Sequence, residues 1–176
     1  MLSNIGILLL RMTLGLTFMG HGSQKLFGWF KGNGWQGTIK WITQMGLRPV
    51  WFWALFSGLS EFGGGLLVFL GFLSPLGSLG IIAAMLTAII KVHWKAGFWN
   101  GNRGIEFPLI NLVSALTLGL TGPGIFALDS ALGIVLPEPL TLIAGLVVVV
   151  LGVLGQGLTK KPAPVSASST GQSNPT

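Results

Sequence analysis

A long apolar run at residues 5–30 constrains this chain more than any other feature of its sequence. A helix that crosses a bilayer takes about 20 consecutive, mostly apolar residues, and this run is long enough. It contains one internal charge, Arg11, and ends in a polar cluster that includes His21 and Lys25. A charge inside lipid is costly unless it has a partner or a role. The main question for this fold is therefore what Arg11 and His21 face.

The composition of the whole chain also indicates a membrane protein. Of its 176 residues, 51% are hydrophobic and 8% are charged, whereas soluble domains carry about 25% charged residues. We expect an all-α integral membrane helical bundle, in which the 28 glycines allow helices to approach closely. The absence of Cys excludes disulfides and thiolate-bound iron–sulfur clusters. The basic residues lie at the ends of apolar runs, which favours a role in membrane orientation over binding of nucleic acid.

Five apolar segments predict five membrane spans, at about residues 5–30, 50–73, 75–92, 106–120 and 140–158. No Lys or Arg precedes the first segment, so we expect a retained helix rather than a cleaved signal peptide. Residues 35–46 have apolar side chains at helical spacing, which fits either an interfacial helix in the membrane surface or a cap packed on the bundle. Residues 160–176 are rich in Pro, Ser, Thr and Ala and predict a disordered tail.

Basic residues are unevenly distributed between the two ends of these spans. The connectors after the first and third spans carry Lys25, Lys31, Lys40, Arg48, Lys91, Lys95 and Arg103. Lys160 and Lys161 follow the fifth span, and the other two connectors contain no Lys or Arg. Since short basic loops stay in the cytoplasm, we expect a multi-pass protein of the bacterial inner membrane with its N-terminus outside and its C-terminus inside.

Two charged residues lie deep inside predicted spans, Arg11 in the first and Glu61 in the second. With a helical rise of about 1.5 Å per residue, both fall within the membrane, and we expect them to pair across the two helices. Such a pair is either a structural ion pair that sets the register of the helices or the centre of a proton or ligand site.

A second polar cluster is predicted at the cytoplasmic ends of the helices and contains His21, Lys25, His93, Trp94, Glu106 and Asn111. His21 and Lys25 are four residues apart and share a helix face. Histidines, a lysine, a carboxylate and a Trp ring at one depth could hold a quinone head group, with His passing protons near neutral pH. The alternative is polar capping of helix ends that face the cytoplasm. Haem ligation by the two His is disfavoured because they lie at different depths, and a metal site of two His and one Glu is no better supported.

Several short motifs occur together along the chain. They are Arg11-x-x-x-Gly15, His21-Gly22-x-x-Lys25, Glu61-Phe62-x-Gly64-Gly65, Val92-His93-x-Lys95, Glu106-Phe107-Pro108, Gly122-Pro123-Gly124 and Leu128-Asp129. In this order and spacing the chain resembles the DoxX family of small bacterial and archaeal membrane proteins. The resemblance covers roughly residues 5–132 and implies a four-helix core at 1–132. Residues 133–159 then form an additional transmembrane helix outside that core.

The family takes its name from a subunit of a thiosulfate:quinone oxidoreductase, and other members are described as membrane partners of oxidoreductases. The resemblance therefore implies a membrane subunit of a quinone-linked oxidoreductase complex, without a redox centre of its own. It implies a quinone as candidate ligand and a soluble or membrane oxidoreductase as partner, and it leaves homo-oligomerisation open. A non-catalytic anchor or scaffold for a soluble partner is the main alternative. A small transporter is disfavoured because the spans show no clear inverted repeat.

Overall fold

The computed structural model describes residues 1–137 and 139–159, and the tail predicted at 160–176 lies outside the described residues. The described part is helical and contains no strand. Three helical stretches are long and apolar enough to cross a membrane, at Leu2–Leu26, Val50–Leu70 and Leu76–Ala96. The apolar helices α5 (Glu106–Thr121) and α7 (Leu140–Gly155) are shorter. An all-α membrane bundle is confirmed, while the five-span topology and its orientation stay predictions.

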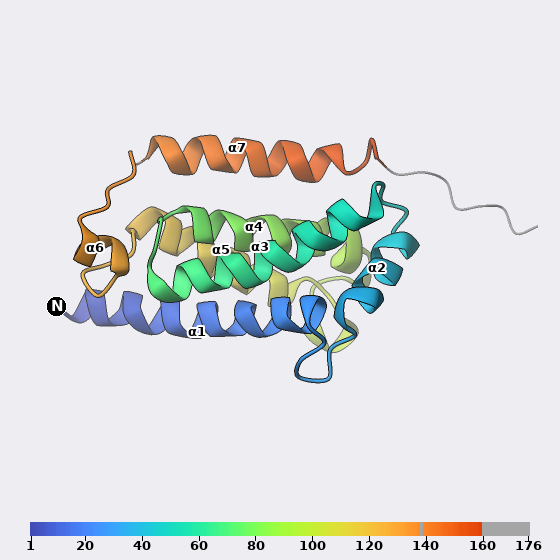
Figure 1. Ribbon diagram of the computed structural model, residues 1–176, viewed down its shortest axis with the longest axis horizontal. Helices are drawn as coiled ribbons and strands as arrows, with labels where there is room; N and C mark the ends of the chain where they lie inside the picture. Colours follow the sequence, from blue (N-terminus) through green and yellow to red (C-terminus); the bar gives the residue numbers. More distant parts are fainter. Residues whose placement is uncertain (138, 160–176) are drawn as a thin grey trace, which may run out of the picture.

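Four helices pack side by side around one apolar core (Figure 1). They are α1 (Leu2–Leu26), α3 (Val50–Leu70), α4 (Leu76–Thr87) and α5 (Glu106–Thr121). The core contains Leu14, Phe18, Val68, Ile81, Ile82, Met85, Ala115 and Leu118. Helix α7 (Leu140–Gly155) runs along the opposite side of the bundle from α1 and packs on α4.

Glycines set the close contact between α1 and α3, which run antiparallel (Figure 1). A Cβ atom at Gly15 would lie 2.7 Å from the Cβ of Phe69, and one at Gly65 would lie 2.7 Å from the backbone nitrogen of Met19. Real Cβ atoms essentially never approach neighbours so closely. Only glycine at these positions lets the two backbones come this near, as small residues do in membrane helix pairs.

Short helices close the two ends of the bundle. At one end, α2 (Gly34–Gln44) packs on α1 and α3 and buries Thr38 and Ile42, while its position in the membrane surface stays a prediction. At the other end, α6 (Leu128–Leu132) lies near the N-terminus. Helix α4 continues without a break into η1 (Ala88–His93), a π-helical turn, followed by the 3₁₀ turns η2 (Trp94–Ala96) and η3 (Asn100–Asn102).

The predicted pairing of Arg11 with Glu61 is wrong. The guanidinium of Arg11 instead donates four hydrogen bonds to backbone carbonyls, to Val68 (3.0 Å), Phe69 (3.0 Å), Pro123 (2.9 Å) and Phe126 (3.2 Å). The antiparallel register explains the error, because it places Arg11 beside the last turn of α3 and places Glu61 about two turns away. Buried Arg11 therefore caps the C-terminal carbonyls of α3, where a cation suits the helix dipole.

Asp129 secures the same end of the bundle. Its Oδ1 accepts a hydrogen bond from the backbone N–H of Leu73 (2.9 Å), and its Oδ2 accepts one from Ser74 (2.8 Å). Its own N–H donates to the carbonyl of Gly71, at the C-cap of α3. Arg11 and Asp129 together tie α1, the end of α3 and the 122–129 segment to one another. In the sequence Asp129 stands out only in the Leu128-Asp129 motif of the family resemblance, which assigns it no structural role.

Candidate functional site

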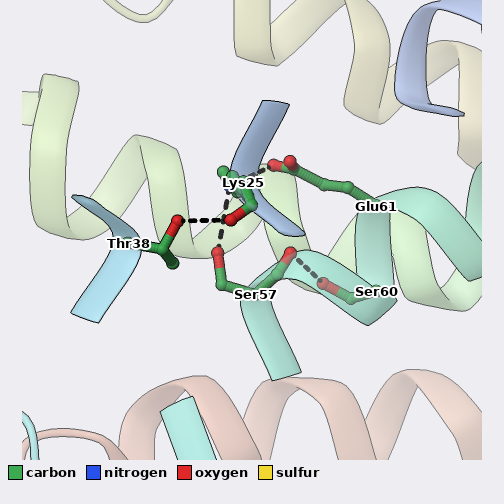
Figure 2. A network of polar contacts seen from close by, with 5 residues as sticks. All are labelled: Lys25, Thr38, Ser57, Ser60 and Glu61. Atoms are coloured by element: carbon green, nitrogen blue, oxygen red, sulfur yellow. Dashed lines mark hydrogen bonds and ion pairs between the residues drawn. The ribbon is translucent and has the colours of Figure 1, made fainter. Parts of the chain in front are cut away.

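The partner of Glu61 is Lys25. Lys25 Nζ lies 2.7 Å from Glu61 Oε1 and donates a second hydrogen bond to Ser57 Oγ at 3.0 Å. Figure 2 shows Lys25 from α1 pointing toward Glu61 and Ser57 of α3. The ammonium also lies 5.4 Å from the centre of the Trp41 ring, within range of a cation–π interaction. The Glu61 side chain is 7% exposed and that of Lys25 is 26% exposed, so the carboxylate is buried and the ammonium is reachable.

Helix α2 holds this ion pair in place from the side. Thr38 Oγ1 lies 2.9 Å from the backbone carbonyl oxygen of Lys25 (Figure 2). It also lies 3.0 Å from that of Gly34, and its one hydroxyl proton can be donated to either. Because Thr38 ties α2 to the last turn of α1, the Trp41 ring stays next to the ammonium. The amphipathic segment predicted at 35–46 is thus part of the wall of the site.

A cavity of about 470 Å³ opens beside the ion pair. Its lining includes the polar side chains of His21, Lys25, Glu61 and His93, together with the aromatic rings of Trp41 and Phe107. These residues come from α1, α2, α3, η1 and α5, so the cavity exists only in the folded bundle. The volume lies within the range of small-molecule sites, about 300–1,000 Å³. The wall is more polar than is usual for such sites, because Gln24, Lys31, Asn33 and Thr38 also line it.

His21 lies between two aromatic rings. Its imidazole centre is 6.2 Å from that of Phe18 and 6.1 Å from that of Phe107. The side chain is exposed rather than buried, which leaves it accessible from the cavity. An imidazole held by apolar rings at a cavity wall can donate or accept a hydrogen bond to a ligand.

The π-helical turn η1 positions His93. A π-helix holds more residues per turn than an α-helix, so it changes the face on which the following side chains lie, and such turns are frequent at functional sites. Ala88, Val92 and His93 of this turn line the cavity. The Nδ1 atom of His93 is hydrogen-bonded to the backbone carbonyl of Arg103. Because a carbonyl only accepts a hydrogen bond, Nδ1 carries a proton. Nε2 is then an acceptor in the neutral ring and a donor in the imidazolium form.

Four predicted site residues lie away from this cavity, namely Arg11 at the other end of the bundle and three residues of the second predicted cluster. Trp94 is 67% exposed and does not line it, which fits an anchor at the membrane interface. Glu106 accepts a hydrogen bond from the backbone N–H of Asn100 at 2.8 Å and closes the polar loop before α5. Buried Asn111 donates to the carbonyl of Phe107 within its own helix. The structure thus brings together His21, Lys25, Glu61 and His93 and separates the other candidates from them.

Comparison with known proteins agrees with this architecture. The profile of the family described as DoxX matches residues 6–94, which contain all four of these polar cavity residues. The chain belongs to the DoxX family. It is 36% identical to "Putative oxidoreductase CatD" of Bacillus subtilis (strain 168) over 125 residues, which are 71% of this chain and 85% of that protein. It is 30% identical to "Inner membrane protein YqjF" of Escherichia coli (strain K12) over 133 residues, 74% of this chain and 95% of that one. No solved structure matches it.

Proposed function

We propose that this DoxX-family protein is the membrane subunit of a quinone-linked oxidoreductase, and that the cavity beside Lys25 and Glu61 binds the quinone head group. The observation that carries the proposal is the meeting of His21, Lys25 and His93 at one cavity in a membrane-embedded bundle. A quinone head group is planar, apolar on its faces and has two carbonyl oxygens that accept hydrogen bonds. The lining supplies donors for those oxygens and aromatic rings for its faces.

The cavity residues also suit the protons of quinone chemistry. Reduction of a quinone to a quinol takes up two electrons and two protons. The side chains of His21 and His93 can each donate a proton as the imidazolium or accept one as the neutral ring, as general acids and bases do. The buried Glu61 carboxylate keeps the Lys25 ammonium beside the cavity as a fixed positive charge. We assign the electrons to a partner oxidoreductase, since the chain contains no Cys to ligate an iron–sulfur cluster.

The names of two relatives support a link to oxidoreductases and a location in the membrane. One relative carries the word oxidoreductase in its name, and another is named an inner membrane protein. The alternative is a non-catalytic anchor that holds a soluble partner at the membrane. The two functions differ in whether the cavity residues contribute to the activity of the complex.

Quinone binding to the purified protein tests the proposal. The full chain is purified with its lipids, endogenous quinone is extracted, and binding of a short-chain ubiquinone is titrated. We expect His21→Leu and His93→Leu each to weaken binding about tenfold, which corresponds to the loss of one hydrogen bond of about 1.4 kcal/mol. Trp94→Leu is the matched control, because this neighbour of His93 lies outside the cavity. If no quinone copurifies and all variants bind as the wild type does, the proposal is wrong and the anchor is favoured.

A further inference from the structure

A second, smaller cavity of about 50 Å³ also touches the Lys25–Glu61 pair. It shares Lys25, Trp41, Glu61 and Ala88 with the larger cavity, and otherwise it extends toward α4 and α7. Its polar lining includes the hydroxyls of Ser57, Ser60 and Thr87 and the amide of Gln156. A cavity needs roughly 10–15 Å³ to hold one water molecule, so this one has room for water.

Two residues of this lining, Glu61 and Gln156, each have a buried side-chain oxygen without a partner. Glu61 Oε2 and Gln156 Oε1 have no hydrogen bond to any of the described residues. Gln156 is 2% exposed and follows directly on α7, and its Nε2 donates to Thr87 Oγ1 of α4 at 3.1 Å. Buried oxygens are normally paired, and when protein groups do not pair them, ordered water usually does.

We propose that the small cavity binds water, which donates hydrogen bonds to Glu61 Oε2 and Gln156 Oε1. Both oxygens are acceptors, so the ligand must supply at least two donors, as water does. A cation is disfavoured because Lys25 already neutralises Glu61, and a further positive charge would be buried without compensation. The inference goes beyond the proposed function, because it does not depend on what the larger cavity binds.

Bound water would give α7 a role at the site. Gln156 lies outside residues 6–94, which match the family profile, and it reaches the ion pair only through this cavity. In this arrangement Gln156 is a positioning residue that acts on the Glu61 carboxylate through water. The oxygen of Glu61 that does not contact Lys25 then also has a hydrogen-bond donor.

An experimental structure of the full chain in lipid nanodiscs, at a resolution that shows ordered water, tests the binding itself. We expect density about 2.5–3.0 Å from both Glu61 Oε2 and Gln156 Oε1. An empty cavity would overturn the proposal, as would a Gln156 side chain that bonds Glu61 directly. Melting temperatures in sodium, potassium and choline chloride test the charge of the ligand. Equal values support water, whereas a rise specific to one metal cation would show a cation site instead.

A spectroscopic readout tests the positioning role. The infrared carboxylate bands of Glu61 are identified as those lost in Glu61→Gln. We expect Gln156→Met, which keeps the length of the side chain but removes its oxygen, to shift these bands. Val148→Met is the matched control on the exposed face of α7, where Val148 is 69% exposed, and should leave the bands unchanged. Unshifted bands in a folded Gln156→Met protein would overturn the positioning role of Gln156. If that variant does not fold, the experimental structure of the wild-type protein still decides whether the cavity holds water.

Discussion

Two buried charged groups in this protein are stabilised in different ways. Arg11 forms no salt bridge with the described residues, and its charge is stabilised by the dipoles of four backbone carbonyls. Glu61 has a true counter-ion in Lys25, supported by Ser57 and the Trp41 ring. The first arrangement fixes one end of the bundle, and the second forms part of a cavity wall. A charge inside a membrane segment therefore lines a cavity here in one case and forms a structural clamp in the other.

Replacing Arg11 should destabilise the protein strongly. In Arg11→Met, carbonyls of Val68, Phe69, Pro123 and Phe126 lose their donor inside the bundle. We expect a loss of about 3–5 kcal/mol, since each unsatisfied buried group costs about 1–3 kcal/mol and some will find water. Thermal melting in detergent measures the effect. Thr13→Val on the exposed face of α1 is the control, and equal melting of Arg11→Met and wild type would contradict the clamp.

The effects of substituting Lys25 and Glu61 on the free energy of unfolding should be strongly non-additive. Lys25→Met leaves a buried carboxylate without its counter-ion, and Glu61→Gln leaves the ammonium without its charge partner. We expect each single change to cost about 2–3 kcal/mol, below the value for a fully buried pair because Lys25 is partly exposed. The double variant should cost clearly less than the two single changes added together. Chemical unfolding of the four proteins in one detergent measures the coupling, and additive costs would contradict a direct interaction.

At the scale of whole helices, contact depends on where the small residues lie and on one irregular turn. Gly15 and Gly65 face the partner helix, whereas Gly63 has open space around its hydrogen atoms. The turn η1 interrupts the regular α-helical period and places His93 at the cavity. Composition alone shows that the helices are glycine-rich, but not which glycines form contacts.

A Gly→Ala substitution made at two sites of α3 separates the effect of helix–helix packing on stability from the effect of helix propensity. Gly65→Ala should cost about 1–3 kcal/mol, because its new methyl group would overlap the backbone of α1. Gly63→Ala should be neutral or stabilising by up to about 1 kcal/mol, since Ala is the better helix former and meets no atom within 4 Å. Melting temperatures of the two variants, measured side by side, test the contact. A ranking in the opposite order would rule out this helix register.

Removal of one residue from η1 should displace His93. Ile90 is exposed on this turn, and its deletion rotates the following residues of the helix, including His93, by about 100° relative to α4. We expect the helical content to persist while quinone affinity falls at least as far as in His93→Leu. Ile90→Ala is the control, because it shortens the same side chain and keeps the backbone length. Unchanged affinity after the deletion would mean that the turn does not orient the site.

At the scale of the whole molecule, the described bundle is a four-helix core with α7 added along α4 (Figure 1). The cavity lies at the end capped by α2, and the Arg11 clamp lies at the end near α6. The basic connectors belong to the cavity end. If short basic loops mark the cytoplasm, the cavity opens toward the cytoplasmic side, where a soluble partner could reach it.

Cysteine labelling tests this orientation, and the absence of native Cys gives a clean background. A single Ser130→Cys at the α6 end should react with an impermeant maleimide in intact cells, since it lies on the side predicted to be outside. Gly101→Cys in η3 and a Cys in the 160–176 segment should react only after permeabilisation. Labelling of Gly101→Cys in intact cells would show that the orientation is the opposite of the one predicted. Labelling of only the tail cysteine in intact cells would indicate four spans instead of five.

The sequence alone determined the membrane class, the helix positions to within a few residues, and the polar motifs of the family. Those features depend on local composition, because an apolar run forms a helix wherever it enters lipid. Only the tertiary structure decided which polar groups meet. Lys25 contacts Glu61, and Arg11 does not, because in antiparallel helices the contacts depend on register and crossing geometry. For the same reason, Asp129 and Gln156 gained roles only through residues distant in the chain.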